Sequence, residues 1–402
     1  MLAFFALLGL TNGDWLARIP ALAHGLHLSD GMLGVALLAT PAGSVAVASL
    51  AGALVDRVGS RAPTMLAGLA VALLPISFGM AGSQAALMVG MFVFGVAAGA
   101  LDVSMNAQAV QLQNAVGRQL MTSLHACYSF GALAGGLVGG AFAWGNVGPT
   151  PDFTAVAVPL AVLALVAGRF LLARGQGASA GAASSREREP MAARPDAAAR
   201  PDAAARRRRG VRLSPLLVLS GLALCSLLGE GAADGWSAVY LRDNLGTSAG
   251  FAAMGYAAFA LTMAFGRLAG DRLADRFGPA ALLRAGGLLA AAGMALALLT
   301  RTPAGALVGF AVYGAGLSCT FPQMLAVAGS IRPDRPGSAI GRVAGTGYVG
   351  LLTGPVMIGG LATAAGLPAA LGLPALLALG IAAGARYGVT AGVGARRRAP
   401  GR

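Results

Sequence analysis

The chain has 402 residues, of which 56% are hydrophobic and only 11% are charged. A soluble domain carries about 25% charged residues, so this composition is too apolar to cover a surface that faces water. Together with a mean hydropathy of +0.72, it excludes an ordinary cytoplasmic enzyme, a secreted disulfide scaffold and a disordered chain. It indicates an integral membrane protein.

Apolar runs of membrane-spanning length recur along the whole chain. A helix needs about 20 apolar residues to cross a bilayer, whereas the strands of a barrel would appear as alternating segments of about 10 residues. The sequence predicts twelve spanning helices, at residues 1–23, 31–55, 62–82, 84–108, 119–144, 153–174, 213–242, 248–268, 279–300, 303–329, 337–365 and 367–390. The predicted fold class is therefore an all-α, polytopic membrane protein.

The basic residues are distributed unevenly about these spans. All 29 are arginines, and the net charge is +14. If the N-terminus is cytoplasmic, all of them except Arg18, Arg242 and Arg301 fall on the cytoplasmic side, which is the positive-inside bias. The distribution favours a multi-pass protein of the bacterial inner (plasma) membrane with both termini cytoplasmic, and it disfavours a nucleic-acid partner. The three cysteines lie singly in apolar runs, so we predict no disulfide, metal or cofactor.

The composition changes between the sixth and seventh predicted spans. Residues 194–209 read RPDAAARPDAAARRRR, and small residues, prolines and like charges cannot bury a core. The sequence predicts an N-terminal six-helix bundle over 1–174, a disordered basic cytoplasmic linker over 175–212, a C-terminal six-helix bundle over 213–390 and a basic cytoplasmic tail over 391–402. We expect the linker to be a tether, with a regulatory or lipid-binding role as the alternative.

The two predicted bundles repeat each other at an offset near 220. Asp56 in DRVGSR matches Asp275 in DRFGPA, Tyr128 matches Tyr348, and Trp15 matches Trp236. Two parallel repeats of six helices are typical of a transporter in which pseudo-two-fold symmetry relates the bundles and the binding site lies between them.

The segment after the second predicted span resembles the signature G-x3-D-[RK]-x-G-x-[RK] of the major facilitator superfamily. The matching residues are Gly52, Asp56, Arg57, Gly59 and Arg61. The second half carries Asp275 and Arg276 at the corresponding place, although Asp271 stands where the signature has glycine. The resemblance implies that these residues form a gate that locks the two bundles on the inner side. The alternative is that the arginines only anchor the topology.

A narrower resemblance rests on NGDWLARIP, GALDVSMNAQ, SLHACYSFG and EGAADGWSAVYL. These segments are similar to a bacterial branch of uncharacterised members, the YbjJ-like group, which is similar to the proton-coupled fucose symporters. Those symporters carry acidic residues on the first and fourth helices, and the resemblance places Asp14 and Asp102 at these positions.

Asp102 is the first candidate for carrying a proton. Gly95, Gly99, Asp102 and Asn106 form one stripe on an apolar helix, and such a stripe must face protein or water rather than lipid. Because Asp102 has no basic neighbour on its own helix, it suits a group that gains and loses a proton during transport. A structural hydrogen bond between helices is the alternative.

Two further pairs of ionisable residues are spaced one helical turn apart. Glu230 and Asp234 fit a proton site, a substrate site rich in acceptors or an interface with an arginine of another helix. Asp14 and Arg18 share a face of the first helix, where an ion pair between them is the plain alternative. The candidates for proton coupling are Asp102, Glu230, Asp14 and Asp234.

Other polar residues lie on helices that line the central cavity in this superfamily, or on the fifth helix. The candidate substrate-binding residues are Asn106, Trp15, Arg18, His125, Ser129, Trp236, Tyr313, Thr320 and Gln323. A lone histidine is more often a packing residue, and the tryptophans suit interfacial anchoring as well as stacking on a sugar ring. Pro322 predicts a kink.

Glycines repeat every fourth residue on the fifth helix, at Gly131 and Gly135, and on the eleventh, at Gly350 and Gly354. They predict close packing against the partner bundle. The alternative is a glycine motif similar to that of drug antiporters.

The sequence therefore predicts a monomeric secondary transporter that moves a small polar solute, a sugar or related metabolite, by alternating access with proton coupling. Proton-driven efflux of drugs or metabolites is the alternative. An enzyme would need a metal cluster or a nucleophile with its base, and a receptor would need a folded soluble domain. Neither is present in the sequence, so we predict no catalytic residue, metal site or cofactor.

Overall fold

The structure is a computed structural model, which describes residues 1–28, 30–173 and 214–396. Within these ranges the regular secondary structure is helical throughout. The predicted linker over 175–212 and the last six residues of the predicted tail lie outside the described residues. Helix α18 continues to Arg396, past the predicted end of the C-terminal bundle at residue 390.

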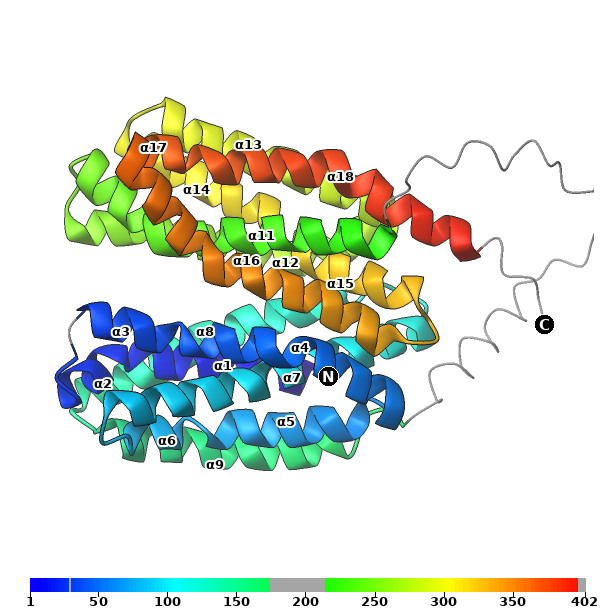
Figure 1. The fold of residues 1–402 in the computed structure, drawn as a ribbon, viewed down its shortest axis with the longest axis horizontal. Coiled ribbons are helices and arrows are strands. Elements are labelled where there is room, and N and C mark those ends of the chain that lie inside the picture. Colours follow the sequence, from blue (N-terminus) through cyan, green and yellow to red (C-terminus); the bar gives the residue numbers. More distant parts are fainter. Residues whose placement is uncertain (29, 174–213, 397–402) are drawn as a thin grey trace, which may run out of the picture.

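The helices form two bundles that lie one above the other in Figure 1. The N-terminal bundle contains α1 (Leu2–Ala17), α2 (Ile19–Gly25), α3 (Asp30–Leu37), α4 (Ala39–Val58), α5 (Arg61–Leu73), α6 (Ile76–Gly79), α7 (Gln84–Val116), α8 (Met121–Trp144) and α9 (Pro149–Gly168). The C-terminal bundle contains α11 (Pro215–Val239), η2 (Tyr240–Asn244), α12 (Ala249–Phe277), α13 (Pro279–Leu299), α14 (Pro303–Leu317), α15 (Thr320–Ile331), α16 (Pro336–Ala365), α17 (Leu367–Ala370) and α18 (Gly372–Arg396).

Most of these elements are long and apolar enough to cross a membrane. Ten candidate spans are found in the described residues, and α1 is a shorter apolar helix. Together with α12, they give six crossings in each bundle, several of which consist of two consecutive helices. The prediction of an all-α polytopic fold in two six-helix bundles is confirmed.

The same helix pairs pack in both bundles, which is the structural form of the internal repeat. Helix α1 packs on α8 as α11 packs on α16, and α4 packs on α7 as α12 packs on α14. Helix α5 packs on α9 as α13 packs on α18. This correspondence agrees with the offset near 220 in the sequence.

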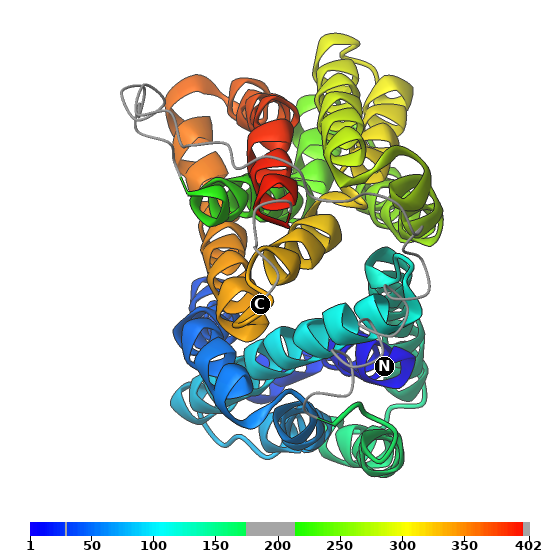
Figure 2. The same ribbon diagram turned by 90° about the vertical axis from the view of Figure 1, so that its right-hand side faces the viewer.

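The two bundles meet along two seams. In one, α4 of the N-terminal bundle packs against α16, and in the other α8 packs against α12. Figure 2 shows α16 lying directly on α4. We call these contacts the α4–α16 seam and the α8–α12 seam.

The regularly spaced glycines pack within their own bundle. A Cβ at Gly131 or Gly135 would collide with the backbone of α1, and one at Gly350 or Gly354 would collide with the backbone of α11. The prediction that they face the partner bundle was wrong, because the first helix of each half approaches its own fifth helix at backbone distance. Glycines that permit close approach between the bundles include Gly52 of α4, Gly337 and Gly341 of α16, and Gly270 of α12, where a Cβ would collide with Thr122 of α8.

Prolines lie at the points where several membrane-spanning segments are interrupted and divide into two helices. Pro322 lacks an N–H, so the carbonyl of Ser318 one turn earlier has no helical partner, and the helix is interrupted at Ser318–Cys319 between α14 and α15. The predicted kink is therefore present about one turn before the proline. Pro20 and Pro75 lie in the same way beside the breaks between α1 and α2 and between α5 and α6.

Candidate functional site

A cavity of about 370 Å³ lies between the two bundles. Its walls come from both halves and reach toward the α3–α4 junction at Leu37 and Thr40, the opposite end of α4 from Asp56. The charged side chains that the described residues contribute to its wall are Asp102, Glu230 and Arg267, with His125 beside them. This volume is in the range of small-molecule sites.

Asp102 joins the two bundles at the cavity wall. One of its carboxylate oxygens accepts a hydrogen bond from the hydroxyl of Tyr348, on α16 of the C-terminal bundle. The other accepts from Asn106 Nδ2 at 2.9 Å. Because Asn106 uses its amide N–H here, its Oδ1 is an acceptor, and His125 Nε2 donates to it at 3.2 Å.

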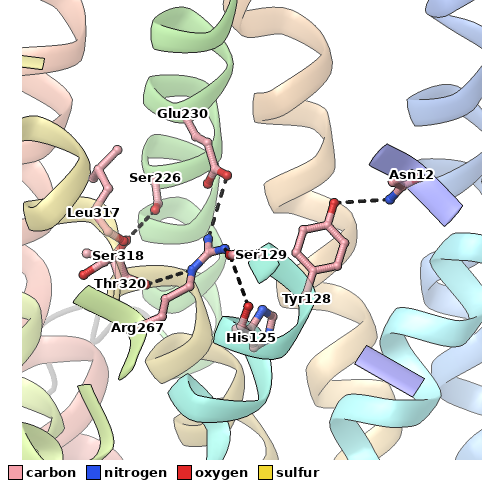
Figure 3. Close-up of polar contacts among 10 residues, drawn as sticks. All are labelled: Asn12, His125, Tyr128, Ser129, Ser226, Glu230, Arg267, Leu317, Ser318 and Thr320. Carbon is pink, nitrogen blue, oxygen red and sulfur yellow. Dashed lines mark hydrogen bonds and ion pairs between the residues drawn. The ribbon is translucent and has the colours of Figure 1, made fainter. Parts of the chain in front are cut away.

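Arg267 of α12 continues this polar network (Figure 3). Its Nη1 donates to Ser129 Oγ of α8 at 2.7 Å, and Ser129 Oγ donates to the His125 carbonyl at 3.3 Å. Its Nη2 lies 3.9 Å from Glu230 Oε1 of α11. The network therefore runs from the C-terminal bundle at Tyr348 through the N-terminal bundle and back.

Pro322 helps to hold Arg267 in place. The Ser318 carbonyl that the proline leaves without a helical partner accepts a hydrogen bond from Arg267 Nε at 3.3 Å. A buried guanidinium is costly unless its donors are satisfied. The break between α14 and α15 supplies one of the acceptors that make this position possible.

Another part of the cavity lining consists of aromatic and amide side chains of the N-terminal bundle. Asn12 Nδ2 donates to the Tyr128 hydroxyl at 3.2 Å, and Trp15 Nε1 donates to Asn12 Oδ1 at 3.2 Å. The Trp15 ring makes edge contacts with Phe78 and Phe94. This wall offers an aromatic face together with polar atoms that can bind hydroxyl groups.

Asp14 and Arg18 lie inside the N-terminal bundle rather than at the cavity. Arg18 Nε is 3.0 Å from Asp152 Oδ2 of α9, and both side chains are buried. Arg18 also donates to the carbonyls of Gly139 and Val147. Asp14 is buried beside Gly139, and its Oδ1 has no hydrogen-bond partner among the described residues. The recorded ion pair of Arg18 is thus with another helix.

The remaining substrate-binding candidates have partners away from the cavity lining. Trp236 Nε1 donates to the Pro355 carbonyl at 3.1 Å, and Gln323 Nε2 donates to Thr122 Oγ1 at 3.0 Å. Thr320 and Ser226 are hydrogen-bonded at 2.7 Å. Tyr313 is fully buried in the C-terminal bundle. Asp234 is exposed in the isolated chain, one turn beyond Glu230. The substrate-binding roles of Trp236, Gln323, Thr320 and Tyr313 and the proton-coupling role of Asp234 stay predictions.

Asp56 closes the α4–α16 seam at the end away from the cavity. Its carboxylate accepts the backbone N–H groups of Gly337 at 2.8 Å and Ser338 at 2.9 Å, and also the Ser338 hydroxyl. These are the first N–H groups of α16, where a helix lacks internal partners and its dipole favours an anion.

The α8–α12 seam has an equivalent closure in which two acids take part. Asp271 accepts the backbone N–H groups of Thr122 at 2.8 Å and Ser123 at 2.7 Å, at the start of α8. Asp275, the sequence counterpart of Asp56, accepts one hydrogen bond from the part of the chain that the structure describes, from the Gln119 N–H at 3.2 Å. The acid that replaces the signature glycine therefore holds the helix start.

The other predicted gating residues lie around these closures. Gly52 touches the Gly337 backbone, and Gly59 adopts a positive φ of 86° that ends α4. Arg61 donates to the Arg169 carbonyl at 3.2 Å, and Arg276 lies over the Phe277 ring. Arg57 is in the last turn of α4.

Sequence reasoning missed Arg267, Asp271, Tyr348, Tyr128 and Asn12 as site residues. Arg267 falls at the end of the predicted span 248–268 and was assigned to the topology signal, but α12 continues to Phe277, which places Arg267 inside the helix. Its spacing of one turn from Asp271 was the available signal. Tyr128 and Tyr348 could have been found because they occupy matching positions of the repeat.

The comparisons with known proteins agree with this architecture. The profile of the Major Facilitator Superfamily matches residues 2–328 and, in a second match, 219–398. The chain belongs to the major facilitator superfamily. An uncharacterized MFS-type transporter of Yersinia pestis is 33% identical over 386 residues, which cover 96% of this chain and 94% of that relative.

Solved structures share the fold at low sequence identity. The fucose:proton symporter FucP of E. coli has a TM-score of 0.72 and 17% identity, with 96% of this chain and 97% of that chain covered. The human organic anion transporter MFSD10 has a TM-score of 0.73 and 18% identity, with 96% and 98% covered. The protein is thus a multi-pass membrane transporter of the superfamily for small molecules, and not an enzyme.

Proposed function

We propose that this superfamily member is a proton-coupled transporter of a small polar solute, in which the protonation of Asp102 biases alternating access. The observation that carries the proposal is the hydrogen bond from Tyr348 to Asp102, which joins the two bundles at the wall of the cavity. The cavity would hold the solute, and the polar network would connect its binding to the proton.

The hydrogen bond gives the proton a means of changing the conformational equilibrium. A bond to an ionised carboxylate is worth about 1.5–3 kcal/mol, roughly twice a neutral one. Protonation of Asp102 removes the charge that Tyr348 binds and weakens a contact between the bundles. The proton thereby has different affinities for the two states, which is the condition for coupling.

The test compares two modes of transport in proteoliposomes with Asp102→Asn. Because asparagine cannot exchange a proton, we expect the variant to lose accumulation driven by an imposed pH gradient while it retains exchange of solute at equal pH. Radiolabelled L-fucose, D-xylose and D-glucuronate serve as solutes, and an internal pH dye reports proton movement. Gradient-driven accumulation at the wild-type level in Asp102→Asn would refute the assignment.

Tyr348→Phe tests the same link from the other bundle. It removes one hydroxyl and keeps the ring, so we expect the same selective loss of gradient-driven accumulation in a milder form. Tyr240→Phe is the matched control, because it removes a buried hydroxyl whose bond to the Ala297 carbonyl stays within one bundle. If both variants behave alike, the bond between the bundles is not what couples the proton.

We further propose that the protein belongs to the YbjJ-like branch and lies in the bacterial inner membrane with the Asp56 end in the cytoplasm. Exposed arginines at that end, among them Arg57, Arg61, Arg276 and Arg335, support this orientation through the positive-inside bias. A single cysteine introduced at exposed Val58, in a variant without native cysteines, should resist an impermeant thiol reagent in intact cells. Rapid labelling there would reverse the orientation.

A further inference from the structure

Arg267 has N–H donors for which the described residues supply no hydrogen-bond acceptor. A guanidinium carries five N–H groups. In Arg267, Nε donates to the Ser318 carbonyl and Nη1 to Ser129 Oγ, while Nη2 lies 3.9 Å from Glu230 Oε1, which is beyond hydrogen-bond reach. Figure 3 shows the guanidinium between Glu230 and Ser129. The side chain is nevertheless only 8% exposed, and it lines the cavity.

A buried cation of this kind needs an anionic partner with good geometry. Glu230 fills this position only loosely, and it is the more accessible member of the pair at 23% exposure. Breaking a buried pair is costly when a charge is left alone, but exchanging one carboxylate for another conserves the charge. A carboxylate that enters from the cavity can bind Arg267 with two parallel N–H bonds, which Glu230 does not make.

Resting on the proposed function, we infer that the substrate is a hydroxylated carboxylic acid of the sugar-acid class, whose carboxylate replaces Glu230 on Arg267. Asn12, Tyr128 and the Trp15 ring, which also line the cavity, supply the partners for ring hydroxyls and for the sugar face. The carboxylate end of the solute faces α12, and its hydroxyl end faces α1 and α8.

The charges of the cavity require that a proton accompany the anion. The ionisable groups close enough to act electrostatically on Glu230 are Arg267 and Tyr256 of α12, Tyr313 of α14, Tyr128 of α8 and, one turn along its own helix, Asp234. Asp102 and Tyr348 line the same cavity. When the substrate carboxylate binds Arg267, Glu230 loses its cation and takes up one proton. One anion and one proton enter together, so the site keeps its net charge.

The experiment measures the thermal stabilisation of the purified protein by three probes that share a pyranose ring. They are D-glucuronate with a carboxylate, D-glucose with none and D-glucosamine with an ammonium group. We expect D-glucuronate to raise Tm most, with a larger shift at acidic than at mildly alkaline pH, because protonation of Glu230 frees Arg267. Greater stabilisation by D-glucosamine, or none by D-glucuronate, would overturn the inference.

Variants of the pair assign the effect to these residues. Arg267→Gln should weaken D-glucuronate binding at least about tenfold, whereas Arg267→Lys keeps the charge and loses less. Glu230→Gln removes the competing carboxylate and should bind D-glucuronate with little dependence on pH, which decides the question even if Arg267→Gln does not fold. Wild-type pH dependence in Glu230→Gln would contradict the exchange of carboxylates.

The inference and the proposed function fail in different ways. If a neutral sugar or an amine drives proton movement that depends on Asp102, and Arg267→Gln leaves that movement intact, proton coupling stands and the sugar-acid substrate is refuted. If D-glucuronate binds through Arg267 but no proton movement depends on Asp102, the proposed coupling is refuted and the binding site stands.

Discussion

Arg18 and Asp152 form an ion pair that is buried between α1 and α9, away from the cavity. Arg18 also binds the carbonyls of Gly139 and Val147, so its cationic head is surrounded by acceptors within the N-terminal bundle. Such a pair contributes little net stability relative to apolar residues, but removing one member leaves an uncompensated buried charge. At the scale of single residues, the replacement of either partner alone should therefore be costly.

Asp152→Leu should lower the free energy of unfolding by about 3–5 kcal/mol, because it strands the Arg18 guanidinium. The double variant Arg18→Met/Asp152→Leu removes both charges and should recover most of that loss. Unfolding of the purified protein in detergent, followed by intrinsic tryptophan fluorescence, measures both. If the double variant is less stable than Asp152→Leu, the ion pair is not the cause.

Single residues also show how far the sequence could predict the site. Asp102, Glu230 and His125 were predicted as rare ionisable residues in apolar helices, and Trp15 as an aromatic residue able to stack on a sugar ring. All four line the cavity. The partners that give them geometry were not predictable, since Tyr348 and Arg267 come from distant helices whose relative rotation is decided by tertiary packing. Arg18 and Arg267 are both isolated arginines near the end of an apolar span, so the sequence does not distinguish them. Of these two, only Arg267 lines the cavity.

At the scale of elements, the fifth helix of each half is an extended contact surface for the first. Gly131 and Gly135 of α8 meet the backbone of α1, and Gly350 and Gly354 of α16 meet that of α11. The spacing of four residues predicted a close helix contact but not the identity of the partner helix. That choice depends on which helix the chain places beside the stripe, and periodicity does not contain this information.

Gly135→Ala should destabilise the protein by about 1–3 kcal/mol, because the new methyl group would overlap the Leu10 carbonyl of α1. Gly140→Ala on the same helix is the matched control, since a Cβ there has no atom within 4 Å. The control should be neutral or slightly stabilising, as alanine favours a helix over glycine. Equal Tm values for the two variants would show that α1 and α8 can separate without cost.

At the scale of the whole molecule, an acid of α4 and an acid of α12 bind the first N–H groups of α16 and α8. These contacts hold the two bundles together at the Asp56 end of the molecule. Among the described residues, Asp56 and Asp271 each accept two backbone N–H groups across a seam, whereas Asp275 accepts one. The sequence predicted the duplicated architecture well, because the repeat, the span lengths and the signature all depend on local patterns. It paired Asp56 with Asp275, while the structure gives the larger share of the second contact to Asp271.

Asp56→Asn and Asp271→Asn should each shift the protein toward a state that is open at this end, because an amide lacks the charge that the helix dipole stabilises. Spin labels at Val58 and Arg335, on opposite sides of the α4–α16 seam, would report a larger population of long distances. Asp275→Asn is the control and should shift the population less. If Asp275→Asn has the larger effect, then Asp275, which occupies the signature position, and not Asp271, holds the α8–α12 seam closed.

Positions 52 and 271 correspond in the internal repeat, but the first is glycine and the second is aspartate. The two seams therefore differ in how closely their helices pack. At Gly52 the backbones of α4 and α16 touch directly, whereas on the other flank a carboxylate shielded from water stands between α12 and α8. Asp56 is half-buried and Asp271 is buried. Because water can compete sooner for the hydrogen bonds of Asp56, we expect the α4–α16 seam to open more readily. We then expect the bundles to rotate apart about the α8–α12 seam, with the larger opening at the α4–α16 seam, instead of separating equally at both seams.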